Sequence, residues 1–421
     1  MTDPTTVPQS HRISPTRHHS ILQRLVDARV SGIVYAAAMF FGYCVIPLVV
    51  QIWVNDYAYL DSVAYLAFVS AVCILLGAAI PIFDPMLPTR HARFAVNERA
   101  FLWCVWGGFA AFAFLAWATA ERIPIIAAIQ GADPATLAEL RERFLKAREG
   151  WQQSFVYINA LFTGAILPYC VARMFAYRLR GRWIALFFFF AYSISFLEKA
   201  YFLKVLIPLF YLVATRKIES KIRPGMMLML LVGIVGMMAF VSGAGESGIV
   251  TTESFFSPHY QPTGPINHMI WRIVSIPVVT AADGLRLFMT QFGGDAFFGA
   301  TSSLLAAITS EVRVPFEQLV FALQWGQNAT GTGSANAVFI IEAYVNFGIV
   351  GVIVFSLIVG VMLRMLAKSK DPAAEACWLL LGFGLYTAGL IGVLLSNGFL
   401  LLFVLILFVR LRPGKTRAAK V

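Results

Sequence analysis

Apolar runs as long as a membrane-spanning helix recur along the chain and restrict what it can fold into. A helical span needs about 20 apolar residues because the hydrocarbon core of a bilayer is about 30 Å thick. No stretch shows the short alternating segments of a transmembrane β-barrel. The sequence therefore predicts an all-α polytopic membrane protein. The apolar runs cover about 31–54, 62–82, 100–120, 155–177, 184–197, 201–214, 226–242, 337–363, 376–394 and 399–410.

The composition agrees with a membrane protein. Of the 421 residues, 59% are hydrophobic and 13% are charged, whereas soluble domains average about 45–50% apolar and about 25% charged. The formal net charge of +11 would favour nucleic-acid binding in a soluble protein. Here the basic residues lie mostly in short loops between apolar runs, where they act as orientation signals. We therefore expect no nucleic-acid partner. The five cysteines form no CxxC pair, and we expect neither a metal site nor a cofactor.

The number of membrane crossings depends on two pairs of short runs. These are 184–197 with 201–214 and 376–394 with 399–410. If every short run crosses once, the basic connectors all fall on one side, and they hold 22 of the 33 Lys and Arg residues. The positive-inside rule then predicts about ten spans with both termini in the cytoplasm. The expected organisation is a cytoplasmic tail (1–30), a membrane bundle (31–242) with an outward loop (121–154), a large outward loop (243–336), C-terminal membrane helices (337–410) and a cytoplasmic tail (411–421).

Both outward loops are expected to contain helices, the first on the membrane or on the protein and the second at the outer interface. In the first loop, Asp133 and Pro134 suit the start of an amphipathic helix, and Arg148 is expected on its polar side. In the second loop, "HMIWRIVSIPVVTAADGLRLF" is interrupted by Pro277 and by charges. Because proline breaks a regular helix, this stretch predicts helical material at the interface rather than a span.

The large outward loop holds only three Lys or Arg residues, Arg272, Arg286 and Arg313. Arg272 and Arg286 flank an apolar stretch, so they are expected near the lipid headgroups, where guanidinium groups bind phosphate oxygens well. The functional interpretation is a lipid-phosphate or diphosphate site. The alternative is pairing with acidic residues of the same loop or contact with bulk lipid.

Two acidic positions in or beside apolar runs are further candidates. Glu342 shares a helix face with Asn346 about 10 Å inside the outward end, and a carboxylate there must face protein or water. It is a proton acceptor, a partner of an outer arginine, or a protonated structural group. Glu198 and Lys199 lie at a turn between two short helices and belong either to a substrate cleft or to a solvated turn.

Histidine is the other candidate base in the large outward loop. His268 has a side chain that can hold a proton near neutral pH. Ordinary packing at the membrane interface is the alternative for this residue.

Two segments resemble the bacterial oligosaccharide repeat-unit polymerases, the Wzy or O-antigen polymerase family. "GTGSANAVFIIEAYVNFGIVGVIV" (331–354), which contains Tyr344, is similar to the family's small-residue turn followed by a Glu/Ala-Tyr and FGxxG helix. "SFLEKAYFLKVLIPLF" (195–210) is similar to its K-x-x-L helical hairpin. The large loop before the first of these segments carries Arg272 in "WRIVSIP", which resembles the arginine-bearing loop of the family.

The resemblance implies a GT-C-like helical fold with a large periplasmic loop, located in the bacterial inner membrane. It implies metal-independent transfer of a growing glycan from one undecaprenyl diphosphate to a sugar hydroxyl on a second lipid-linked repeat unit. The reaction would occur at the periplasmic face during O-antigen, capsule or exopolysaccharide synthesis. The implied partners are the undecaprenyl-diphosphate-linked oligosaccharide, membrane lipid and a chain-length-determining co-polymerase.

Such a reaction needs cations for the diphosphate leaving group and an acceptor for the hydroxyl proton. The expected proton acceptors are Glu342, Glu198 and His268. The expected substrate contacts are Arg272, Arg286, Lys199, Arg148, Tyr344 and Asn346.

Three other functions stay open at this point. An O-antigen ligase would use the same donor with a different acceptor. A transporter or flippase of lipid-linked sugars predicts repeated halves and charges deep in several spans, whereas here the charges cluster at the outer rim. A structural scaffold would need neither the outer arginines nor Glu342.

Overall fold

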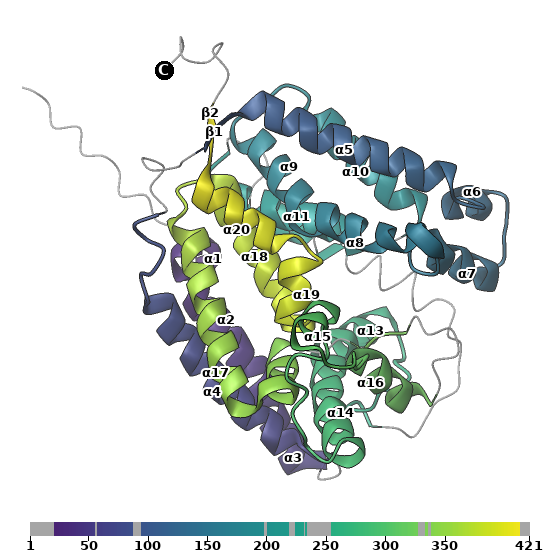
Figure 1. Ribbon diagram of the computed structural model, residues 1–421, viewed down its shortest axis with the longest axis vertical. Helices are drawn as coiled ribbons and strands as arrows, with labels where there is room; N and C mark the ends of the chain where they lie inside the picture. Colours follow the sequence, from purple (N-terminus) through teal and green to yellow (C-terminus); the bar gives the residue numbers. More distant parts are fainter. Residues whose placement is uncertain are drawn as a thin grey trace, which may run out of the picture.

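The computed structural model describes residues 21–54, 57–86, 94–197, 200–218, 224–230, 232–233, 254–326, 333–335 and 338–412. These residues form a bundle of helices and one two-stranded sheet (Figure 1), which confirms the all-α prediction. Short 3-10 or π-helical turns carry the label η. The elements are α1 (Ile21–Val26), η1 (Ala28–Val30), α2 (Ser31–Phe40), η2 (Phe41–Val45), α3 (Ile46–Val54), α4 (Leu60–Ala79), β1 (Phe94–Asn97), α5 (Glu98–Ala118), α6 (Pro124–Ile129), α7 (Pro134–Leu145), η3 (Gly150–Gln153), α8 (Ser154–Leu161), η4 (Phe162–Ile166), α9 (Leu167–Ala176), α10 (Arg182–Ser195), α11 (Ala200–Ala214), α13 (Pro265–Ile270), η5 (Trp271–Ser275), α14 (Ile276–Gln291), α15 (Ser303–Thr309), α16 (Phe316–Trp325), α17 (Phe339–Lys368), α18 (Pro372–Thr387), α19 (Leu390–Leu395), α20 (Phe399–Phe408) and β2 (Val409–Arg412).

Six helical stretches in the described part of the chain are long and apolar enough to cross a membrane. Helix length alone therefore does not reproduce the expected count of about ten spans. Three of the other expected spans form shorter apolar helices, α10, α11 and α20, and a short helix crosses a bilayer only if the bilayer thins or flanking residues snorkel. The six long stretches are Ala28–Trp53, Leu60–Ala79, Glu98–Ala118, Gly150–Ala176, Ile266–Gln291 and Phe339–Lys368.

The sequence does not predict a span over the stretch Ile266–Gln291, because Pro277 is expected to interrupt the helix. In the structure the helix continues through this position. Pro277 occupies the first turn of α14, where a missing N–H costs little, and the π-helical turn η5 precedes it. The placement of 243–336 outside the membrane stays a prediction.

The most extensive helix contact in the described chain is between α4 and α17, which run side by side in Figure 1. A methyl group added at Gly77 would lie 2.2 Å from the Leu357 carbonyl oxygen, and one at Gly360 would lie 2.2 Å from the Ile74 carbonyl oxygen. The two backbones are therefore in direct contact, as is usual for membrane helices whose interface carries small residues. The Ser356 hydroxyl donates to Ser70 Oγ at 2.8 Å within the same interface.

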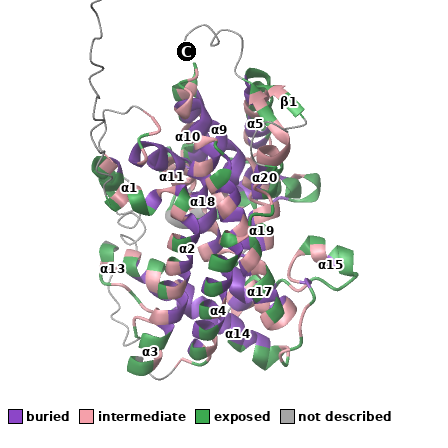
Figure 2. Cartoon of the chain, turned by 90° about the vertical axis from the view of Figure 1, so that its left-hand side faces the viewer, coloured by how far each residue is buried: buried purple, intermediate pink, exposed green. Residues whose placement is uncertain are grey.

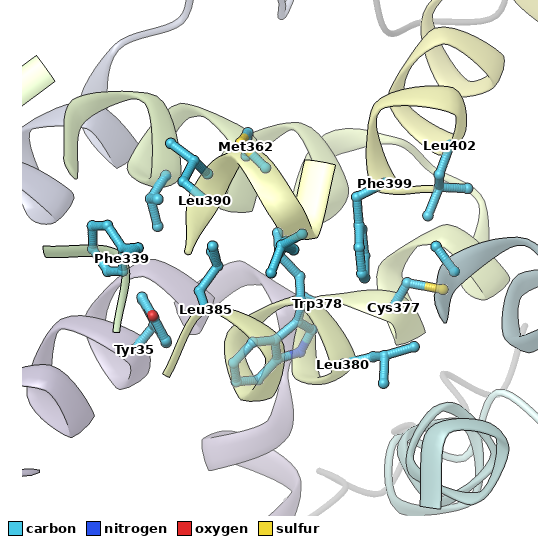
Figure 3. Close-up of a cluster of buried hydrophobic side chains, with 14 of the residues drawn as sticks. Tyr35, Phe339, Met362, Cys377, Trp378, Leu380, Leu385, Leu390, Phe399 and Leu402 are labelled. Carbon is cyan, nitrogen blue, oxygen red and sulfur yellow. The ribbon is translucent and has the colours of Figure 1, made fainter. Parts of the chain in front are cut away.

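Helix α18 lies at the centre of the apolar core. Figure 3 shows Trp378 and Leu385 on α18 meeting Tyr35 from α2, Phe339 from α17 and Phe399 from α20. The Trp378 indole N–H donates to the Val26 carbonyl oxygen at 3.0 Å, so this large ring is buried without an unsatisfied donor. Buried residues follow these inner helices, whereas exposed residues follow the outer faces (Figure 2).

Helix α17 is broken near its beginning. Gly348 has φ 62° and ψ −154°, a conformation that favours glycine. Because a break of this kind removes helical hydrogen bonds, the carbonyls before it need other partners. The Val345 and Asn346 carbonyls accept from the backbone N–H groups of Phe297 and Phe298, both at 3.0 Å. The break therefore attaches the loop before α15 to α17.

The two ends of the bundle differ in their contents. Strands β1 and β2, which were not predicted, pair in parallel at one end, with Phe94 opposite Val409. Helices α13 to α16 gather at the other end (Figure 1). At the strand end, Arg364 binds the Asp84 carboxylate through both oxygens, and this guanidinium lowers the pKa of Asp84.

The α4–α17 contact predicts the effect of enlarging Gly360. Gly360→Ala places a methyl group into backbone, so we expect a destabilisation of about 1–3 kcal/mol and a lower midpoint of thermal unfolding in detergent. Gly107→Ala is the matched control, because no atom lies within 4 Å of a methyl group at that helical position. Equal midpoints for the two variants would contradict the close contact.

Candidate active site

A cavity of about 150 Å³ lies at the end of the bundle that holds α13 to α16. Its walls come from the beginning of α17, the beginning of α16, the loops before and after α15 and the segment before α17. Several of its side chains are polar or charged, whereas the interior of the bundle is apolar. The lining residues are Thr301, Arg313, Pro315, Phe316, Glu317, Gln318, Ser334 and Glu342.

Glu342 is half-buried in the first turn of α17 and reaches the cavity. Its carboxylate also faces the N-terminus of the short helix α19, where the Ile391 backbone N–H donates to Oε2 at 3.4 Å. A methyl group at Gly389 would lie 2.6 Å from the Glu342 carboxyl carbon, so the two segments are in tight contact. The carboxylate thus accepts from an N–H group that the start of a helix leaves unpaired.

Glu317 and Arg313 bring one further charge of each sign to the cavity. The Ser334 hydroxyl donates to Glu317 Oε2 at 2.9 Å, and the Ala335 N–H donates to the Glu317 carbonyl at 2.9 Å. Much of the Glu317 residue is exposed, but protein atoms surround its carboxyl group. The loss of water around this group raises the pKa of Glu317, although the Ser334 hydrogen bond and the Arg313 charge act to lower it. Arg313 is exposed and makes no hydrogen bond or ion pair with the described residues.

The position of α16 is fixed by a buried polar contact with α14. The Gln324 side-chain amide donates to Asp283 at 2.9 Å and to Thr280 Oγ1 at 3.1 Å. The Tyr57 hydroxyl lies 3.3 Å from the same Asp283 carboxylate. Since buried polar groups are costly unless they are hydrogen-bonded, these contacts hold Glu317 at the cavity through the helix that carries it.

Asn346 holds the loop that forms another wall. It is fully buried, and its Oδ1 accepts from the Gly299 N–H at 3.0 Å. Its amide nitrogen donates to Thr301 Oγ1 and to the Glu342 carbonyl, both at 2.7 Å. Asn346 and Glu342 share a helix face as predicted, but Asn346 acts on the loop backbone and does not line the cavity.

The arginines expected to bind phosphate do not line this cavity. Arg272 lies in η5, is exposed, and has its guanidinium 5.9 Å from the Trp271 ring centre. Arg286 is exposed on α14, one turn after Asp283. Both remain accessible for a ligand, so their proposed role as substrate contacts stays a prediction.

Arg148 is not on the polar side of the predicted amphipathic helix. Helix α7 ends at Leu145, and Arg148 is buried, with 8% of its surface exposed. Its guanidinium donates to the Phe144 and Ala116 carbonyls and to Thr119 and Gln152 side chains, at distances from 2.5 to 3.0 Å. Arg148 lies three residues after the end of α7. Its side chain points into the protein because these acceptors satisfy the N–H groups of its guanidinium.

The remaining predicted residues are dispersed. His268 is buried in α13, with its ring 5.7 Å from that of Trp271. Tyr344 is half-buried on α17 and packs edge-on against Phe288 at 6.1 Å. Neither lines the cavity. Glu198 and Lys199 lie outside the described residues.

The C-terminal part of the chain matches a known protein family. Residues 318–410 match the family model described as O-antigen polysaccharide polymerase Wzy. The match supports membership of the Wzy family. The matched residues run from α16 to α20 and contain the segment "GTGSANAVFIIEAYVNFGIVGVIV" with Glu342. The match confirms the resemblance of this segment to the family. No curated protein and no solved structure matches the chain significantly, so the GT-C-like fold stays a prediction.

Arg313 and Glu317 are cavity residues that sequence reasoning did not select. They lie just before the matched segment, more than 20 residues from Glu342 in the sequence. The available signal was Pro315 with Glu317 two residues later, which marks a helix start with an acidic first turn. That signal predicts the helix but not its position beside α17.

We call the hydrogen bonds from Asn346 to Gly299 and Thr301 the Asn346 clamp. Removing the Asn346 side chain should have a local effect on the loop that they hold. Asn346→Ala leaves the Gly299 N–H and the Thr301 hydroxyl without a partner, a loss of about 1–3 kcal/mol for a buried group. Amide hydrogen exchange in the loop 297–301 should therefore accelerate. Thr309→Ala is the control, because that exposed hydroxyl donates only within its own helix. Unchanged exchange in Asn346→Ala would refute the clamp.

Proposed function

We propose that this chain polymerises lipid-linked oligosaccharide repeat units, as the name of its family indicates, and that the cavity beside Glu342 holds the reacting sugar. The observation that carries the proposal is the meeting of Glu342, Glu317 and Arg313 at one cavity, inside or next to the segment that matches the family. The substrate would be an undecaprenyl-diphosphate-linked oligosaccharide used for O-antigen, capsule or exopolysaccharide synthesis.

The charges of the cavity suit this chemistry. In the reaction, an acceptor sugar hydroxyl forms a bond to the donor's anomeric carbon, and the bond from that carbon to the diphosphate oxygen breaks. Arg313 carries a guanidinium that would stabilise the negative charge on the departing diphosphate. Glu342, which lies inside the segment that matches the family, would accept the hydroxyl proton, and Glu317 would accept hydrogen bonds from sugar hydroxyls.

The lining of the cavity is mostly polar or charged, and such groups match the hydroxyls of a sugar rather than the hydrocarbon of a polyprenyl chain. The lipid would therefore stay in the bilayer with its diphosphate near the rim. Arg272 and Arg286 are exposed and would contact the diphosphate from the outer loop. In this arrangement the cavity faces the periplasm from the inner membrane, and a co-polymerase sets the chain length.

Glycolipid analysis in a host strain that lacks the gene tests this function. Glu342→Gln keeps an acceptor for the Ile391 N–H but loses the carboxylate base, and Arg313→Gln loses the cation. We expect both variants to yield a single repeat unit where the wild type yields a ladder, because loss of a general base costs about 10²-fold or more in rate. Glu311→Gln, an exposed residue that does not line the cavity, should restore the ladder.

Equal amounts of each variant in the membrane are the required control. A full ladder from Glu342→Gln and Arg313→Gln together would overturn the assignment of the cavity. Complete gene loss that leaves long lipid-linked polymer without transfer to the final acceptor would indicate a ligase. Repeat units retained on the cytoplasmic side would indicate a flippase.

A further inference from the structure

Two hydroxyl side chains, Thr301 and Ser334, line the cavity beside Glu342. A hydroxyl group has one proton to donate and two lone pairs that accept, so its partners in the protein decide what it can offer to a ligand. The Ser334 hydroxyl donates its proton to Glu317 Oε2 at 2.9 Å. Ser334 therefore already uses its donor, whereas the partners of Thr301 are different.

The orientation of the Asn346 side-chain amide determines how Thr301 is bonded. The Gly299 N–H can only donate, and it lies 3.0 Å from one end of the amide. The Glu342 carbonyl can only accept, and it lies 2.7 Å from the other end. The amide oxygen must therefore face Gly299 and the amide nitrogen must face Glu342, because a flipped amide would lose both hydrogen bonds.

This orientation leaves the Thr301 hydroxyl as a donor. The second N–H of the Asn346 amide nitrogen donates to Thr301 Oγ1 at 2.7 Å, so Thr301 accepts here and keeps its own proton for another partner. No group in the part of the chain that the structure describes accepts from this hydroxyl. Because Thr301 lines the cavity, its proton is available to an acceptor inside the cavity.

The same amide holds Thr301 close to the residue that carries the proposed base. Asn346 Nδ2 contacts both Thr301 Oγ1 and the Glu342 carbonyl oxygen at 2.7 Å. Asn346 is fully buried, so these contacts do not compete with bulk water. The Thr301 hydroxyl therefore has a fixed place relative to the start of α17, and a donor that is already in place loses little freedom when a ligand binds.

We propose that the Thr301 hydroxyl donates a hydrogen bond to an oxygen of the sugar that carries the attacking hydroxyl, next to the position that Glu342 deprotonates. This inference rests on the proposed function. A sugar ring fits the pattern because its neighbouring carbons carry oxygens that both donate and accept. The carboxylates of Glu342 and Glu317 can only accept, and Thr301 supplies a neutral donor beside them. A sugar that lacks an oxygen at this position would leave a polar group of the cavity unpaired and would be rejected.

Elongation of lipid-linked repeat units by the purified full-length protein in detergent tests the proposal. The probe is the repeat-unit lipid extracted from the host strain that lacks the gene. Thr301→Val keeps the branched side chain and removes the hydroxyl. We expect its kcat/KM to fall about tenfold, which corresponds to about 1.4 kcal/mol, near the upper end for one neutral hydrogen bond. Thr301→Ser keeps the hydroxyl and should restore most of the rate.

Amide hydrogen exchange separates substrate binding from support of the loop. In Thr301→Val the Gly299 N–H still has the Asn346 oxygen as its acceptor, so exchange in the loop 297–301 should stay as in the wild type. A loss of rate that is accompanied by faster exchange in this loop would overturn the proposal. Thr309→Val is the matched control, because that exposed hydroxyl donates only within its own helix, and it should change neither rate nor exchange.

The remaining outcomes distinguish this inference from the function on which it rests. If the wild type elongates the repeat units and Thr301→Val does so equally well, the role of Thr301 is wrong and the proposed function still stands. A rate for Thr301→Ser as low as that for Thr301→Val would also overturn the role of the hydroxyl. If the wild type itself does not elongate the repeat units, the proposed function fails, and this inference fails with it.

Discussion

The arrangement of this bundle depends on the direct backbone contact between α4 and α17. In a bilayer, lipid is as apolar as the helix surfaces, so helices associate through close packing and hydrogen bonds rather than through removal of apolar area from water. Gly77 and Gly360 allow that approach, and Ser70 with Ser356 adds a hydrogen bond inside it. Helix α17 carries Glu342, so this contact places the carboxylate relative to the rest of the bundle.

A second constraint is that every polar group in the bundle needs a partner. The break at Gly348 frees carbonyls, and the loop 297–301 supplies their hydrogen-bond donors together with the clamp from Asn346. Glu342 in turn satisfies N–H groups at the start of α19. The same contacts that satisfy the backbone also bring Thr301, α16 and α17 around one cavity. The site is thus formed where irregular backbone is stabilised, which is a recurring arrangement in membrane proteins.

Features set by local chemistry were predicted from the sequence. In the described part of the chain, most apolar runs of spanning length became helices, and Asp133 caps α7 by accepting from the Thr136 N–H at 3.0 Å. Features set by distant contacts were not. The pairing of β1 with β2 joins segments more than 300 residues apart, and Arg148 is buried because acceptors from another helix surround it. Arg313 and Glu317 reach Glu342 only through the packing of α16, which has no local signature.

A structure of the Glu342→Gln variant with a bound lipid-linked repeat unit, determined by electron cryomicroscopy, tests the central claim most directly. The account predicts density for a sugar in the cavity lined by Glu317, Ser334 and residue 342, with the diphosphate near Arg313. Sugar density at another site, with this cavity unchanged by the ligand, would contradict it.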